Sequence, residues 1–109
     1  MGRRKPVVRY LGGLSGSGIL RCGERDVGRV AFDFDGYDRE PQGVSLCGEI
    51  RLDADVLQAV FGRPDVELIT EEGQLFHLRF SEKSLPAAAE AAHVDVVGPL
   101  PELPAHWRC

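Results

Sequence analysis

Two aspartates, Asp33 and Asp35, stand two residues apart at the end of an apolar stretch and directly before Gly36. Together with Asp38 they offer several hard oxygen ligands on one strand end and the loop after it, the donor type that divalent cations prefer. The spacing lacks the pattern of a calcium loop and its closing Glu, so it favours weak cation binding over a specific metal site. Apolar and polar residues alternate over 30–35, which also explains both aspartates as the polar face of an amphipathic strand.

The stretch Val30-Ala-Phe-Asp33-Phe-Asp35-Gly36-Tyr37 resembles the first motif of the haloacid dehalogenase phosphatase superfamily. The resemblance covers eight of the 109 residues, and Tyr37 stands where that family usually has Thr. It implies metal-dependent phosphoryl transfer, with Asp33 as nucleophile and Asp35 as general acid beside a magnesium ion. It also implies a parallel sheet with a helix after each strand, whereas the alternation here leads into another strand. Phosphoryl transfer is therefore the alternative function.

The remaining reactive side chains are scattered. The chain has three cysteines and three histidines and no Cys-x-x-Cys pair, so the sequence predicts neither a zinc site nor any other cofactor. An odd cysteine count without short spacings fits a reducing cytoplasm. The glycine-rich stretch over 12–18 has Ile19-Leu20 where a phosphate loop needs Lys and Ser or Thr.

Charge divides the chain into a basic start and an acidic body. Four of the 13 basic residues, Arg3, Arg4, Lys5 and Arg9, lie within the first nine positions. The other 9 face all 17 acidic residues, so residues 10–109 carry a formal charge of −8. Such a body repels nucleic acid and anionic lipid. No apolar run approaches the roughly 20 residues that cross a bilayer, so we expect no membrane partner. With the cysteine pattern, we expect a cytoplasmic protein of bacterial type.

Periodicity supplies the elements that would position these residues. Alternating patterns predict six strands, at 19–22, 27–37, 44–52, 66–70, 75–80 and 94–97. Asp53 is suited to cap a helix that ends at Gly62 before Pro64. A capping Ser84, an early proline and a run of alanines predict a second short helix over 84–92.

These elements predict a single, mainly β domain (α+β at most). We expect a small six-stranded, partly open antiparallel β-barrel, with one helix between strands three and four and a short helix before the last strand. The order of the first six elements matches an OB-type barrel, although other half-open barrels and α+β sheets share it. Residues 1–17 are expected to form a flexible basic and glycine-rich arm, 18–98 the barrel-like domain, and 99–109 a proline-rich tail.

The leading hypothesis is a non-enzymatic protein-interaction or self-associating module. The expected interaction residues are Tyr37 and, in the extended tail, Leu100, Leu103 and Trp107. The tail could pack on its own barrel, on a second copy or on another protein. Open sheet edges of a small barrel allow homodimerisation by strand pairing. A third hypothesis, single-stranded nucleic-acid binding, needs a basic groove with exposed aromatics, whereas this body is acidic. No small-molecule ligand is indicated.

Overall fold

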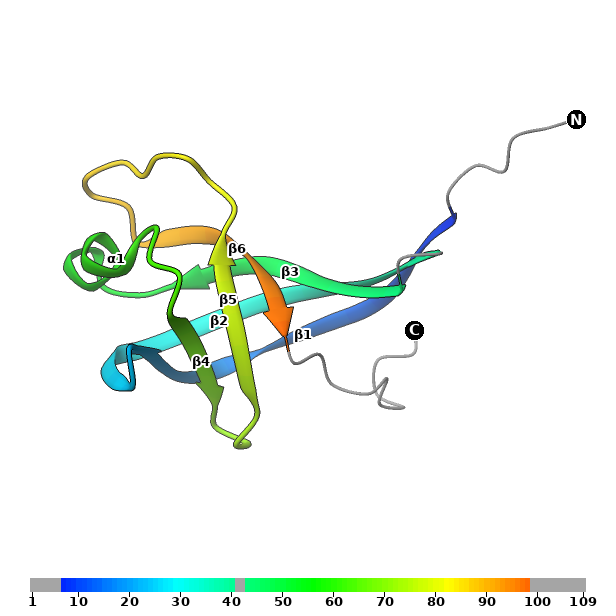
Figure 1. Ribbon diagram of the computed structural model, residues 1–109, viewed down its shortest axis with the longest axis horizontal. Helices are drawn as coiled ribbons and strands as arrows, with labels where there is room; N and C mark the ends of the chain where they lie inside the picture. Colours follow the sequence, from blue (N-terminus) through cyan, green and yellow to red (C-terminus); the bar gives the residue numbers. More distant parts are fainter. Residues whose placement is uncertain (1–6, 41–42, 99–109) are drawn as a thin grey trace, which may run out of the picture.

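The computed structural model describes residues 7–40 and 43–98. Six strands and one helix follow each other along the chain: β1 (Val7–Cys22), β2 (Arg25–Glu40), β3 (Gly43–Arg51), α1 (Ala54–Val60), β4 (Val66–Thr70), β5 (Leu75–Phe80) and β6 (Ala91–Gly98). All strand pairs are antiparallel, and the strands close into a barrel in the order β1-β2-β3-β6-β5-β4 (Figure 1). The mainly β, six-stranded antiparallel barrel with a helix between β3 and β4 is confirmed. No described helix is long and apolar enough to cross a membrane.

The core fills the barrel with the inward faces of the alternating strands. Phe34 of β2, Leu46 of β3 and Phe76 of β5 are each almost completely buried. Phe34 and Phe76 meet edge to face with their ring centroids 6.2 Å apart. The alternation in the sequence therefore assigned these faces correctly, because successive side chains of a strand point to opposite sides of a sheet.

Helix α1 lies at one end of the barrel (Figure 1). Asp53 caps it as expected, since its carboxylate Oδ1 accepts a hydrogen bond of 2.9 Å from the Asp55 backbone N–H. Leu57 and Val60 are buried, so the short helix contributes its apolar side to the core.

The second predicted helix is wrong. Residues 84–90 form an irregular loop with one turn, in which Ala89 N–H donates to the Pro86 carbonyl. Ala91 and Ala92 belong instead to β6, where they pair with Arg51 and Ile50 of β3. Tertiary pairing overrides the helix preference of alanine here.

The prediction of an irregular glycine-rich segment before Gly18 is also wrong, because β1 begins at Val7. β1 pairs with β2 from Val7 opposite Glu40 to Cys22 opposite Arg25. Its last five residues, Gly18–Cys22, pair with β4 as well. This second pairing closes the barrel that was expected to be partly open.

Because β4 and β6 are shorter than β1, β2 and β3, part of the sheet lies outside the barrel. β4 reaches only the last five residues of β1, and β6 pairs with β3 only from Leu46 to Arg51. The first half of β1, the end of β2 and the start of β3 therefore form a ribbon that extends away from α1 (Figure 1). In the described part of the chain, no strand pairs with the second side of β1 along residues 12–17.

Candidate interaction surface

Along residues 12–17, one side of β1 has no strand partner among the described residues. The Ser17 carbonyl points to the β4 side of β1, because it accepts a 3.0 Å hydrogen bond from the N–H of Glu71, just past the end of β4. Residues two apart in a strand present their backbone groups to the same side. The register between β1 and β2 is regular from Gly12 to Leu20, so Ser15 and Gly13 present their N–H and C=O groups to the side that β4 no longer covers.

A small hollow adjoins this edge where β1 and β4 separate. It has a volume of about 90 Å³ and is lined by Leu14, Ser15, Gly16, Ser17, Phe32, Thr70, Glu71, Glu72 and Gln74. Pockets for small molecules usually have about 300–1,000 Å³. The hollow is therefore sized for a side chain that arrives with a neighbouring strand.

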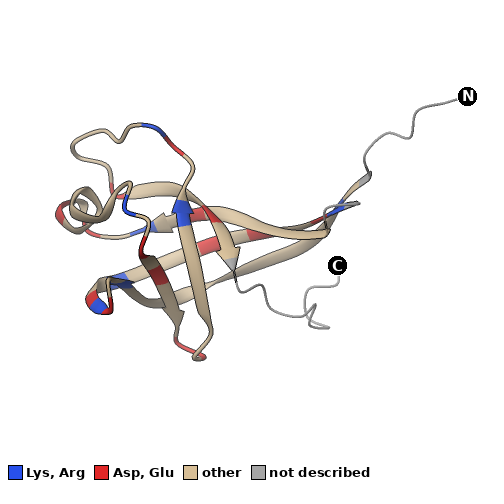
Figure 2. Ribbon diagram, viewed as in Figure 1, with Lys and Arg blue, Asp and Glu red and all other residues tan. Residues whose placement is uncertain are grey.

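Acidic residues lie along β2, in β3 at Glu49 and in the β4–β5 turn (Figure 2). Asp33 is exposed and stands opposite Glu49 of β3. Asp35 is half-buried and accepts a 2.9 Å hydrogen bond from the Tyr10 hydroxyl. Both aspartates point outward from the middle of a strand, which confirms their place on the polar face.

The structure does not bring the three candidate metal ligands together. Asp38 lies an odd number of residues from Asp33 and Asp35 in a regular strand, so its side chain is on the opposite face. It pairs there with Arg9, whose Nη2 lies 3.6 Å from Asp38 Oδ2. Among residues 7–40 and 43–98, no group of three or more His, Cys, Asp or Glu side chains is arranged to hold a metal ion. The parallel sheet implied by the phosphatase resemblance is also corrected, since the motif lies within an antiparallel barrel.

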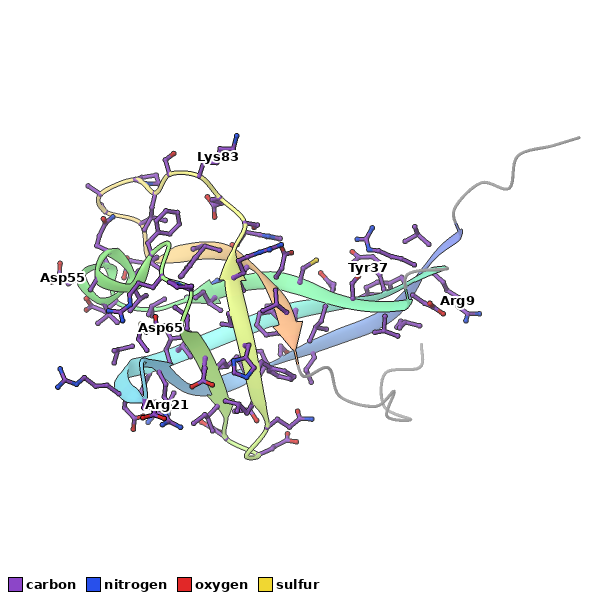
Figure 3. The ribbon with its side chains drawn as sticks, viewed as in Figure 1. Arg9, Arg21, Tyr37, Asp55, Asp65 and Lys83 are labelled. Carbon is purple, nitrogen blue, oxygen red and sulfur yellow. The ribbon has the colours of Figure 1, made fainter. Side chains whose placement is uncertain are left out.

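Tyr37 lies on the outer face of the ribbon, near its end with Arg9 (Figure 3). Its ring is 5.5 Å from that of Tyr10, its partner on β1, and the Arg39 guanidinium lies 5.2 Å from its centroid. Val8 is on the same face and is 52% exposed, and Tyr10 is 49% exposed. Leu100, Leu103 and Trp107 lie outside the described residues.

A serine and a histidine that sequence reasoning did not connect also meet. Ser81 Oγ is 2.9 Å from His93 Nδ1 and 3.0 Å from the His93 carbonyl oxygen. A hydroxyl has one hydrogen, so when it donates to the carbonyl, Nδ1–H must donate to Oγ. In this arrangement His93 cannot accept the Ser81 proton as a general base would. The pair extends the β5–β6 ladder, as does the bond from Ser81 N–H to the same carbonyl.

Burial disfavours a reactive role for Cys22. Desolvation raises the pKa of its thiol, which donates a 3.2 Å hydrogen bond to Asp65. The thiolate is the nucleophilic form of cysteine, so this group stays protonated and unreactive near neutral pH.

A second depression, of about 340 Å³, lies between the α1–β4 loop and β5–β6. It includes Arg63, Phe80 and the exposed Val97. Arg63 is already bound to Asp65 through two hydrogen bonds of 3.0 and 2.8 Å. This depression therefore offers apolar contact but few uncommitted polar groups.

Sequence reasoning missed Gly13 and Ser15 as functional candidates, because glycine and serine give no periodic signal. One indication was available: the eight residues from Tyr10 to Ser17 contain neither a charge nor a proline.

The described residues define a small closed antiparallel β-barrel with a ribbon, in which no described strand pairs with the second side of β1 along residues 12–17. Comparison with protein-family models, with curated proteins and with solved structures found no match.

Proposed function

We propose that this protein is a non-enzymatic protein-interaction module that binds an extended polypeptide segment by strand addition to β1. The observation that supports it is the edge of β1 over residues 12–17, where no described strand pairs with its second side and the backbone groups of Gly13 and Ser15 are directed outward. Strand addition obtains affinity from main-chain hydrogen bonds and specificity from pockets for alternate side chains. The hollow beside Ser15 and Phe32 is suited to be such a pocket.

A displayed library of random extended peptides tests the proposal, with selected peptides measured against the full chain. Ser15→Pro removes an N–H on the open edge, a position at which strands tolerate proline. Ser15→Ala is the matched control, because it keeps the N–H. We expect selected peptides to bind the wild type and Ser15→Ala alike, and to bind Ser15→Pro at least about tenfold more weakly, the equivalent of one to two lost hydrogen bonds.

Amide hydrogen exchange in the wild type provides a measurement that does not depend on the variant folding. Bound peptide should slow exchange at Gly13 and Ser15. Peptides that protect other amides, such as those near Phe80 and Val97, or that bind Ser15→Pro with unchanged affinity, would overturn strand addition to β1.

A further inference from the structure

The hollow beside β1 lies on the inner face of that strand, just past the point where β4 ends. Gly16 stands opposite the buried Phe32 of β2, and Leu14 packs against the core, so both belong to the face that points into the barrel. A Cβ atom at Gly16 would lie 3.3 Å from Phe32 Cζ. Because Gly16 has no side chain, the space beside the Phe32 ring stays open, and the ring lines the hollow. The floor of the hollow is therefore apolar.

The rim of the same hollow is acidic. Glu71 and Glu72 are exposed in the β4–β5 turn and both line the hollow (Figure 2). Glu71 is already paired with Arg29, whose Nη2 lies 3.5 Å from Glu71 Oε1. The Glu72 carboxylate has no hydrogen-bond or ion-pair partner among the described residues. No Lys, Arg or His lines the hollow in the described part of the chain, so one negative charge at its rim is uncompensated.

Hydrogen bonds hold this acidic turn in place. Thr70 N–H donates to the Gln74 carbonyl over 2.9 Å, and Gln74 N–H donates to Thr70 Oγ1 over 3.0 Å. Glu71 N–H donates to the Ser17 carbonyl, which ties the turn to β1. The backbone that carries Glu72 is therefore fixed relative to the edge of β1 before a partner arrives, which reduces the ordering cost of binding.

We propose that the segment added to β1 carries a lysine or arginine side chain that enters this hollow, an inference that rests on the proposed function and names the class of its partner. Side chains of an added strand alternate between the two faces of the sheet, so every second one points to the inner face beside Leu14 and Gly16. A long basic side chain can lay its aliphatic stem against Phe32 and direct its charged end to Glu72.

Other side chains fit this hollow less well. An apolar side chain would contact Phe32 but would partly desolvate the Glu72 carboxylate without giving it a partner. An acidic side chain would be repelled by both carboxylates at the rim. The acidic body of the chain, which has more Asp and Glu than Lys and Arg, also attracts a cationic segment over a longer range.

Selection of displayed random extended peptides on the full chain tests this inference. We expect the selected peptides to share one position that is occupied by Lys or Arg. A selected peptide with Lys at that position is then compared with the same peptide carrying norleucine, which keeps the stem and lacks the charge. The lysine peptide should bind the wild type about two- to fivefold more tightly, as expected for one exposed ion pair. Added salt should reduce this preference.

Glu72→Gln removes the charge at the rim with little change of size, and it should abolish the preference for lysine over norleucine. Glu90→Gln is the matched control, because Glu90 is exposed in the loop before β6 and does not line the hollow. This control should keep the preference. Glu72→Lys should instead favour the peptide that carries Glu at the shared position.

The outcomes distinguish the basic side chain from strand addition itself. Peptides that slow amide exchange at Gly13 and Ser15 but share no basic position overturn the basic side chain and leave strand addition intact. A preference for lysine that persists in Glu72→Gln, or that is lost equally in Glu90→Gln, has the same consequence.

A preference that depends on Glu72 without protection of Gly13 and Ser15 overturns strand addition and this inference with it, as does a library that yields no binding peptide. Protection of both amides by a peptide whose lysine preference requires Glu72 supports the inference.

Discussion

Asp65 shows how one carboxylate can hold several segments together. It accepts hydrogen bonds from Arg63 Nε and Nη2, two residues earlier, and from the Cys22 thiol at the end of β1. The Arg63 hydrogen bonds, followed by that of Cys22, lower its pKa from 3.8 to about 2. The ionised form is therefore the one that the folded state stabilises.

This shift predicts a specific dependence of stability on pH. A carboxylate whose pKa is lower in the folded state adds stability above its unfolded value, and that stability disappears as the pH falls through the folded value. For Asp65 the window lies between about pH 4 and pH 2. We expect Asp65→Asn to flatten the decline in the free energy of unfolding across this window, measured by urea denaturation at a series of pH values.

Asp33→Asn is the control for Asp65→Asn, because it removes an exposed carboxylate of the same type away from the Arg63 pair. It should leave the slope between pH 4 and pH 2 close to that of the wild type. Parallel profiles for the wild type and Asp65→Asn would show that the Asp65 hydrogen bonds add no stability.

At the scale of elements, the fold depends on how closely β1 approaches β4. A Cβ atom at Gly18 would overlap the carbonyl oxygen of Ile69 and lie 3.0 Å from its carbonyl carbon. Both are rigid backbone atoms, so only a residue without a side chain allows this pairing. Gly18 is thus required by the closure of the barrel and not by a turn.

Substitution of two β1 glycines should separate this requirement from a general effect of alanine. Gly18→Ala should lower the free energy of unfolding by about 1–3 kcal/mol, because the strands must move apart. At Gly13 the nearest atom to a new Cβ is Tyr10 Oη at 3.6 Å, an ordinary contact. Gly13→Ala should therefore change the free energy of unfolding by no more than about 0.5 kcal/mol. Equal losses in urea denaturation would contradict the close approach at Gly18.

At the scale of the whole molecule, the barrel and its ribbon produce an elongated shape. The principal extents are 53 × 30 × 22 Å and the radius of gyration is 15.0 Å. A compact chain of this length would have a radius of about 13 Å. The difference comes from β1, β2 and β3, which continue beyond the region covered by β4 and β6 (Figure 1). The ribbon thus places backbone edges and side chains outside the core.

The barrel proper depends on α1 to cover one end. Leu57 is fully buried in the common core, so Leu57→Ala should cost about 2–5 kcal/mol of unfolding free energy through lost burial and a cavity. Leu75→Ala is the matched control, since Leu75 is 37% exposed and should lose much less. If Leu57→Ala lost as little unfolding free energy as Leu75→Ala in urea denaturation, α1 would not be part of the cooperative core.

The sequence by itself determined most of the local structure. Period-two alternation located β2, β3, β4 and β5, and it assigned Phe34, Leu46 and Phe76 to the core, because burial on one face leaves a direct record in the residue pattern. The capping carboxylate of Asp53 located the helix in the same way. The outward direction of Asp33 and Asp35 also followed from alternation alone.

Only the tertiary structure decided that residues 7–17 belong to strand β1 and which surface lies beside them. Residues 7–17 form a strand because β2 pairs with them along this stretch. Their glycines and serines show no alternation from which the pairing could be predicted. Residues 91–92 joined β6 for the same reason, against their helix preference. How much of β1 is covered by β4 depends on the relative lengths of the two strands once the barrel closes. That quantity belongs to two segments far apart in the chain, so no local stretch of sequence contains it.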